Sequence, residues 1–458
     1  MYKTGIESNA AHTMPKFKPL RYHRTQAALW QSQARFNVVP AGRRSGKTEI
    51  AGKRKLVVKA MKGNEEGNWK GFAAAPTRDQ AKRIYWEDLK RLVPVTLRAK
   101  APSESSLIIT IVNGSEIHIL GMDKPERAEG TPWDHGVMDE YGNMKEEAWP
   151  MHVRPALSDR RGTCDFIGVP EGRNHYYDLA MDAMADMDMH PDGNNTWGYY
   201  HWLSEDILPE EEILQAKKDL DELTYQQEYC GSFVVFSGLA YYKFDRKVHV
   251  SSCNQFYNKH HPLILTFDFN VSPGTANVIQ EMTEWPQSQV PLIGHTCTSV
   301  IDEVYIPKNS NTERVCNTIV ERYGNHQGLV FCYGDATGGA KGTAKVKGSD
   351  WDLIKGILNP VFDTRISYKY RRSNPKERRR VNAVNSRLMN MMGDIHLQID
   401  GAKAPNTVKD FEGTRILDGT AGEIDKKSDP KLTHLTDGIG YYIAEKFPVI
   451  KPQAATGY

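Results

Sequence analysis

The chain has 458 residues, 39% of them hydrophobic, and a net charge of only +2. This length is more than one hydrophobic core usually supports, so we expect two or three domains, and near-neutrality excludes a uniformly basic protein. The sequence has no apolar run of the ~20 residues that a membrane helix needs, no signal-peptide core, and six cysteines without a CxxC pair, which predicts an intracellular protein with reduced thiols and no membrane contact.

Residues 38–48, Val-Val-Pro-Ala-Gly-Arg-Arg-Ser-Gly-Lys-Thr, pass from an apolar strand end through a loop into a helical pattern over 49–61. This order is typical of a phosphate-binding loop, in which backbone N–H groups and a helix N-terminus face the phosphates. A chance glycine turn before a helix is the alternative. We expect Lys47 to reach the β and γ oxygens and Thr48 to ligate Mg²⁺, although Ala41 stands where the motif usually has glycine. The predicted loop contacts to nucleotide are Ala41, Gly42, Arg43, Arg44, Ser45, Gly46, Lys47 and Thr48.

Three further residues are candidates for the same site. Gln26 precedes the loop, and its amide offers adenine both a donor and an acceptor, although a surface glutamine is the alternative. The apolar run 136–138 ends in Asp139 and Glu140, which predicts a magnesium carboxylate followed by a general base; a solvated strand end is the alternative. Arg127 is a candidate arginine finger, with Arg43, Arg44 or a plain surface salt bridge as alternatives.

The second half of the chain places four acids in or beside apolar segments. They are Asp268, Glu303, Asp335 and Asp437, with Asp302 as a competitor of Glu303. Burying one as an unpaired ion costs several kcal/mol, so the set predicts bound cations, although a single acid is also explained as a strand-end cap. Carboxylates that hold two Mg²⁺ or Mn²⁺ ions are how nucleases activate water, so we expect a nuclease site.

A local basic run separates the last two of these acids. Interleaved with tyrosines, it predicts a surface that binds the DNA backbone without sequence choice, whereas a solvated charged face is the alternative. The predicted DNA contacts are Lys369, Arg371, Arg372, Lys376, Arg378, Arg379, Arg380 and Arg387.

Pattern changes along the chain predict the domain limits. We expect an N-terminal arm over 1–20, an ATPase domain over 21–240 that includes a helical linker region at about 203–240, a nuclease domain over 241–447 and a polar tail over 448–458.

Together, these motifs resemble one family, the large terminase subunit of tailed bacteriophages. The resemblance covers about residues 20 to 445 and rests on Gln26, the loop 41–48, Ala75-Pro76-Thr77 with Gln80 and Lys82, Asp139-Glu140, Gly168-Val169-Pro170, Asp268, Asp335 and Asp437. It implies an α/β fold: an N-terminal RecA-like ATPase of the additional-strand type with a parallel-rich sheet, and a C-terminal RNase H-like nuclease. Gly168-Val169-Pro170 lacks the hydroxyl residue often found in the family's coupling motif.

The resemblance also implies a function. The chain would use ATP with Mg²⁺ to drive double-stranded viral DNA into a procapsid and two Mg²⁺ or Mn²⁺ ions to cut concatemeric DNA. Its implied partners are a small terminase subunit and the portal protein, on which it forms a homo-oligomeric ring, with a monomer as the alternative state of the chain alone. The implied location is the host cytoplasm, outside the mature virion. The rival interpretations are a helicase-nuclease of DNA repair and a DNA-binding ATP switch with an inactive nuclease domain.

Overall fold

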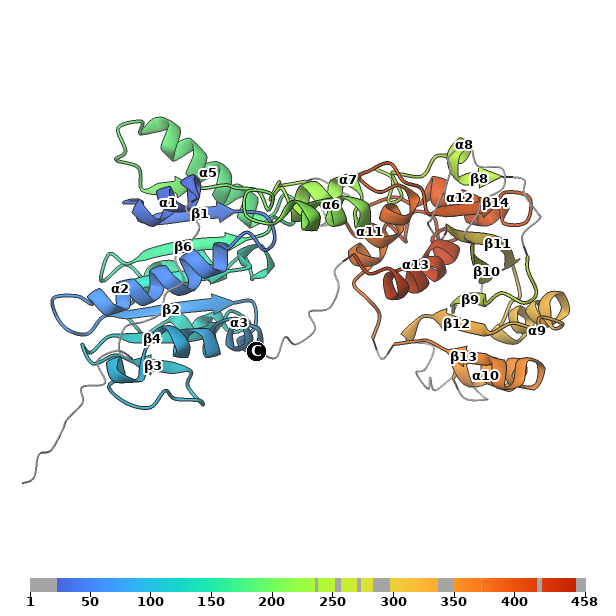
Figure 1. Ribbon diagram of the computed structural model, residues 1–458, viewed down its shortest axis with the longest axis horizontal. Helices are drawn as coiled ribbons and strands as arrows, with labels where there is room; N and C mark the ends of the chain where they lie inside the picture. Colours follow the sequence, from blue (N-terminus) through green and yellow to red (C-terminus); the bar gives the residue numbers. More distant parts are fainter. Residues whose placement is uncertain are drawn as a thin grey trace, which may run out of the picture. The chain divides into compact units, whose positions relative to one another are not determined.

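The computed structural model describes residues 23–234, 238–251, 257–269, 273–282, 297–336, 349–371, 373–417 and 422–449 (Figure 1). They form two compact units. The first contains the described residues up to 213 together with 226–234, and the second contains 214–225 together with the described residues from 238 onward. Residues 214–225, which the sequence analysis placed in the first domain, therefore pack with the second. The predicted arm and most of the predicted tail lie outside the described residues.

The first unit is built on a seven-stranded sheet that is parallel except at one edge. In spatial order its strands are β3 (Ile108–Thr110), β4 (Glu116–Gly121), β2 (Lys70–Ala75), β5 (His135–Asp139), β6 (Thr163–Gly168), β1 (Phe36–Pro40) and β7 (Trp197–Tyr199). Only β3 pairs antiparallel, with β4, and the connection passes through Asn113 and Gly114, whose φ is +88°. This is the hairpin that the Asn-Gly pair predicts.

Helices cover both faces of this sheet, so its strands are apolar in continuous runs. One face packs against the π-helix η2 (Thr48–Lys55), α2 (Leu56–Lys62) and α3 (Arg78–Leu92), and the other packs against α5 (His175–Met189). Side chains alternate along the strands. Val38 belongs to the cluster that holds Tyr176 of α5, whereas Val39 belongs to the cluster that holds Ile50 of η2.

Short helices complete the first unit and lead toward the second. In the first unit they are α1 (Arg24–Gln31), η3 (Val95–Leu97), η4 (Pro125–Ala128), η5 (Tyr141–Asn143), η6 (Ala148–Val153) and α4 (Arg154–Ala156). Helices α6 (Glu210–Asp219) and α7 (Glu222–Glu228) each contain residues of both units, because residues 214–225 belong to the second.

The second unit is built on a seven-stranded mixed sheet. Its spatial order is β13 (Ile366–Tyr368), β12 (Val330–Gly334), β9 (Leu263–Asp268), β10 (Gly274–Met282), β11 (Cys297–Ile306), β14 (Leu397–Asp400) and β8 (Val250–Ser251). Strand β10 runs antiparallel to both of its neighbours, and the other pairs are parallel.

Helices also cover both faces of the second sheet. One face packs on α9 (Thr312–Tyr323) and α10 (Asp350–Phe362), and the other on α11 (Glu377–Leu388), α12 (Pro405–Gly413) and α13 (His434–Lys446). Short α8 (Arg246–His249) and η8 (Asp363–Arg365) complete the unit. In β9, Leu265 and Phe267 join the α9 and α10 side while Ile264 joins the α13 side, so the period of two directs Asp268 toward α13.

Two expectations from the sequence, on membrane helices and on cysteines, can be compared with the described residues. Within these ranges, no helix combines the length and apolar character of a membrane span. The five cysteines that the structure describes are free thiols, and Cys253 lies outside the described residues.

Candidate nucleotide and acid sites

The loop between β1 and η2 has the backbone shape that phosphate binding requires. Arg44 and Gly46 have φ values of +59° and +82°, so the chain turns sharply before the helix. The side-chain amide of Gln26 and the indole N–H of Trp202 both donate to the Ser45 carbonyl, each at 2.9 Å. Gln26, which the sequence predicts to contact adenine, therefore contacts the phosphate-binding loop itself.

Lys47 lies at the centre of this loop and is buried. Its Nζ donates to the Gly42 carbonyl at 3.2 Å. Burial lowers the pKa of Lys47, while the negative charges of Glu140 and Asp139 oppose this shift. The ammonium group is thus within electrostatic range of both predicted acids.

Asp139 ends β5 and contacts the residue that follows the loop lysine. Thr48 Oγ1 donates to Asp139 Oδ2 at 2.9 Å, and Tyr85 Oη donates to the same oxygen at 2.7 Å. A hydroxyl and a carboxylate are the hard oxygen ligands that Mg²⁺ prefers, so Thr48 and Asp139 fit the predicted ion. Burial raises the pKa of Asp139, as expected of a carboxylate that a cation would stabilise.

Glu140 follows in a left-handed backbone conformation, φ 57° and ψ 41°, which is uncommon for a residue with a side chain. Burial and then the charge of Asp139 raise the pKa of Glu140. A methyl group built on Gly168 would lie 3.5 Å from the Cα of Glu140, and the Gly168 carbonyl accepts the Ala41 N–H at 3.2 Å. The end of β6 thus touches both the loop and the candidate base.

Arg43 is held by a residue far along the chain. Its side-chain Nε lies 2.6 Å from Glu228 Oε2, and its backbone N–H donates to the Glu228 carbonyl. Burial alone would lower the pKa of Arg43, but the Glu228 carboxylate outweighs it and the pKa is raised. Ser204 Oγ donates to the Arg43 carbonyl at 2.6 Å.

The three predicted nuclease aspartates converge on one region of the second unit. Asp268 ends β9 and Asp335 directly follows β12, and these strands are parallel neighbours with Gly334 opposite Phe267. Asp437 lies on α13, which packs on both strands. Burial raises the pKa of Tyr441 on the same helix, and the negative charges of all three aspartates raise it further.

Each aspartate already has a protein partner. Asp437 accepts hydrogen bonds from Arg380 at 2.6 Å and from Lys426 at 2.7 Å. His434 Nδ1 lies 2.9 Å from Asp268 Oδ2, and the Asn374 amide donates to Asp335 at 2.7 Å. In the described part of the chain, no three His, Cys, Asp or Glu side chains are arranged to share a metal ion. A ready-made metal centre is therefore not seen there.

Glu303, the fourth predicted acid, has a different environment. Its two oxygens accept hydrogen bonds from the backbone N–H groups of Asn406 and Thr407 at 2.9 and 2.7 Å, and from the side chains of both residues. These residues begin α12, so a helix N-terminus satisfies the carboxylate. These contacts give Glu303 a structural role in place of the predicted metal, and metal ligation by Glu303 stays a prediction. Its competitor Asp302 pairs with Arg322 at 3.1 Å.

Comparisons with known proteins bear on this arrangement. Residues 39–247 match the family model described as "Terminase large subunit, T4likevirus-type, N-terminal". The large terminase subunits of Thermus virus P23-45 and Escherichia phage T5 are each 26% identical to this chain, over 260 and 232 residues. Each alignment covers 49% of this chain, and they cover 51% and 49% of the relatives.

Solved structures extend the likeness to both units. The large terminase from a thermophilic bacteriophage has a TM-score of 0.61 at 14% identity and covers 94% of this chain and 99% of its own. The same protein in complex with ADP has a TM-score of 0.60 at 14% identity, with 92% and 98% covered. The resemblance to large terminase subunits is confirmed. The predicted two-part α/β terminase fold is confirmed as well, while the chain spans about half the length of the sequence relatives it matches.

The basic run over residues 369–387 divides into surface and buried residues. Arg380 is 3% exposed and pairs with Asp437, and Arg387 is 8% exposed and donates to Thr298 Oγ1 at 2.8 Å. The prediction that these two arginines contact DNA is wrong, because both pack in the interior of the unit.

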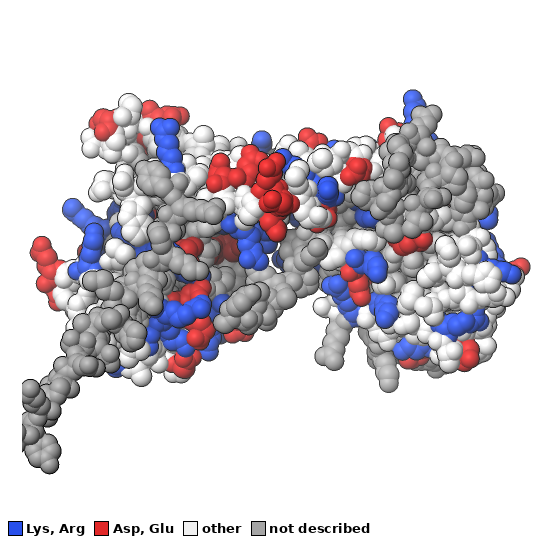
Figure 2. All heavy atoms as spheres, viewed as in Figure 1, with Lys and Arg blue, Asp and Glu red and all other residues white. Residues whose placement is uncertain are grey.

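The remaining members stay candidates for DNA contact. Lys369, Arg371, Lys376 and Arg379 are exposed, Arg378 is half-buried, and Arg372 lies outside the described residues. Arg371 pairs with Glu445 at 3.0 Å. On the face drawn in Figure 2, basic side chains are interspersed with acidic ones, as the near-zero net charge leads one to expect.

Arg127 lies on η4 and is exposed. Its side chain forms no hydrogen bond or ion pair with another residue of the described ranges. An exposed position leaves it available to a second copy of the chain, so its role as an arginine finger stays a prediction.

Sequence reasoning missed the residues that hold the two sites. Tyr85 contacts Asp139 from 54 residues away along the chain. Trp202 and Glu228 contact the loop residues Ser45 and Arg43 from 157 and 185 residues away. Their side chains carry no motif of their own. For Lys426 the sequence did contain an indication, because this residue lies in the polar segment just before Asp437.

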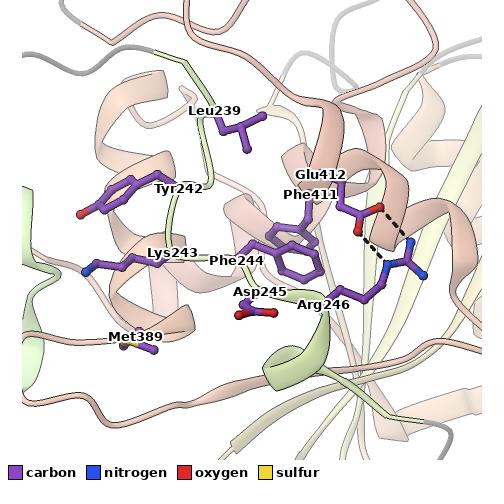
Figure 3. A pocket seen from close by; sticks show the side chains of 9 residues that line it. All are labelled: Leu239, Tyr242, Lys243, Phe244, Asp245, Arg246, Met389, Phe411 and Glu412. Carbon is purple, nitrogen blue, oxygen red and sulfur yellow. Dashed lines mark hydrogen bonds and ion pairs between the residues drawn. The ribbon is translucent and has the colours of Figure 1, made fainter.

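A separate pocket in the second unit has a volume of about 490 Å³ (Figure 3). The rings of Phe244 and Phe411 stack in it with centroids 5.1 Å apart, and Arg246 forms a bidentate pair with Glu412. None of the predicted site residues lines this pocket.

Proposed function

We propose that the chain is a large terminase subunit whose first unit hydrolyses ATP to drive double-stranded DNA into a procapsid. The observation that carries the proposal is the contact of Thr48 with Asp139 beside the buried Lys47, at the start of the helix that follows the loop. An ammonium group, a hydroxyl and two acids gathered at one helix N-terminus are typical of a site for a nucleoside triphosphate and its magnesium ion.

The residues have separate tasks in this hydrolysis. Lys47, now bonded to the Gly42 carbonyl, would neutralise phosphate oxygens. Thr48 and Asp139 would hold the magnesium ion, which would supply further charge neutralisation when bound. Glu140 orients and deprotonates the attacking water, because it directly follows the magnesium carboxylate Asp139 and burial raises its pKa, which makes the carboxylate a better proton acceptor.

For the second unit we propose metal-dependent cutting of concatemeric DNA. The acids Asp268, Asp335 and Asp437 lie within electrostatic range of one tyrosine, which supports a shared cation site once Asp437 is released from its basic partners. The DNA would lie across the exposed members of the basic run. The further proposed partners are a small terminase subunit and a portal protein that carries a ring of these chains in the host cytoplasm.

The two rival functions differ in the second unit. A helicase needs a second RecA-like domain with a mostly parallel sheet, whereas here antiparallel β10 lies in the centre of the sheet, which favours packaging. A DNA-binding ATP switch with an inactive nuclease domain differs only in the chemistry of the acids, so experiment must separate it from the nuclease.

One preparation of the full chain tests both activities. Lys47→Ala should abolish ATP hydrolysis yet leave Mn²⁺-dependent cutting of plasmid DNA, while Asp268→Ala and Asp335→Ala should do the reverse. Equal loss of both activities in a folded Lys47→Ala protein would contradict two separable sites. Cutting that persists in both aspartate variants would refute the nuclease assignment.

A further inference from the structure

The carboxylate of Asp139 is held by more than the hydroxyl of Thr48. It is 2% exposed, and its Oδ2 accepts the hydrogen bond from Tyr85 at 2.7 Å, while its Oδ1 accepts the Glu140 N–H at 3.0 Å. Three donors on two oxygens leave the side chain little freedom to rotate. The strongest of these donors by distance is a tyrosine that no motif predicts.

Tyr85 is itself fixed. It is fully buried on α3, and a methyl group added to Gly52 of η2 would lie 2.6 Å from its hydroxyl. The absence of a side chain at Gly52 therefore lets the tyrosine reach across the helix that begins at the phosphate loop. A phenol is protonated at neutral pH and a carboxylate oxygen can only accept, so Tyr85 is the donor of the hydrogen bond to Asp139.

We infer that Tyr85 is a positioning residue that aims the Asp139 carboxylate at the magnesium ion of a bound nucleotide. The inference rests on the proposed ATPase function and deepens it. Without this donor the carboxylate would lose the contact that selects its rotamer, so the cost should appear in the response to Mg²⁺ rather than in nucleotide binding as such. Tyr85 acts through Asp139 and needs no contact with the nucleotide.

Tyr176 provides a matched control. It is also fully buried in the first unit. However, its hydroxyl has only a long 3.4 Å hydrogen bond to the Phe166 carbonyl. Removal of this hydroxyl deletes the same atom from an equally buried ring on the other face of the sheet.

The experiment measures affinity for a fluorescent ATP analogue with Mg²⁺ and with EDTA, for the full-length wild type, Tyr85→Phe and Tyr176→Phe. We expect Tyr85→Phe to reduce the Mg²⁺ enhancement of affinity by roughly tenfold and to leave the EDTA affinity within about twofold. Tyr176→Phe should match the wild type in both conditions.

Three results would overturn the inference: an unchanged Mg²⁺ enhancement in Tyr85→Phe, an equal loss of affinity in EDTA, or the same loss of enhancement in Tyr176→Phe. A wild-type protein that binds no nucleotide would overturn the proposed function and the inference together. Normal wild-type binding with an unaffected Tyr85→Phe variant would overturn the inference alone.

Discussion

Removal of the Lys55 ammonium group should loosen the strand that touches the phosphate loop. Lys55 is the last residue of η2, and its Nζ lies 2.9 Å from Asp165 Oδ2 on β6. Lys55 is 7% exposed and Asp165 is fully buried. The pair therefore joins the helix that follows the loop to the strand whose last carbonyl, at Gly168, accepts the Ala41 N–H.

The size of the effect follows from what remains after Lys55→Met. Asp165 keeps the amide of Asn37 at 2.7 Å and has His135 3.8 Å away. The pKa of His135 is lowered well below its usual value, first by burial, so its ring is neutral and gives no compensating charge at pH 7. Breaking a buried ion pair by removing one partner costs about 3–5 kcal/mol, which is roughly 10²- to 10⁴-fold in an opening equilibrium.

Hydrogen exchange of the full chain measures this opening locally. Amides of β6 should exchange faster in Lys55→Met by that factor, and amides of β9 in the second unit should not change. The double variant Lys55→Met with Asp165→Asn should recover most of the protection, because it buries no unpaired charge. Unchanged exchange of the β6 amides in Lys55→Met would refute the reasoning. So would a double variant whose loss of protection equals the sum of the losses in the two single variants.

The remaining predictions concern the second unit. Joint reversal of Lys376 and Arg379 to Glu should flatten the slope of log affinity for DNA against log salt by about 2, measured by fluorescence anisotropy. Arg387→Gln should leave that slope unchanged and lower the melting temperature instead; a flattened slope there would contradict its burial. Lys426→Met should raise the affinity for Mn²⁺ several-fold, as measured by titration calorimetry, because it removes a competing cation from Asp437. Unaltered affinity would show that Lys426 does not compete with the metal.

The sequence predicted the parts of this fold that depend on local order. Hydrophobic periodicity and turn chemistry are enough to predict three elements that the structure contains. They are the strand at 38–40, the Asn-Gly hairpin and the strand that ends at Asp139. The contacts of Tyr85, Trp202 and Glu228 could not be predicted in this way. They depend on which helix crosses which strand, and a buried tyrosine with a partner has the same sequence pattern as one without.

The basic run shows a case in which the sequence contained an unused signal. Arg380 and Arg387 are seven residues apart, two turns of a helix, and Val384 lies four and three residues from them. All three therefore share the face on which α11 packs against α13 and the sheet. The density of charge in the run predicted that Arg380 and Arg387 are exposed to solvent, whereas their position on the apolar face of the helix predicted that they are buried.

Burial of an acid is a poor indicator of metal binding until its partners are known. Glu303 and Asp437 are both buried carboxylates in the second unit, and both are satisfied. The partners of Glu303 include backbone N–H groups of a helix end, which cannot leave without unwinding α12. The partners of Asp437 are the side chains of buried Arg380 and half-exposed Lys426, and the lysine side chain can rotate into solvent when a divalent ion arrives. A replaceable cationic partner therefore makes Asp437 the stronger metal candidate of the two acids.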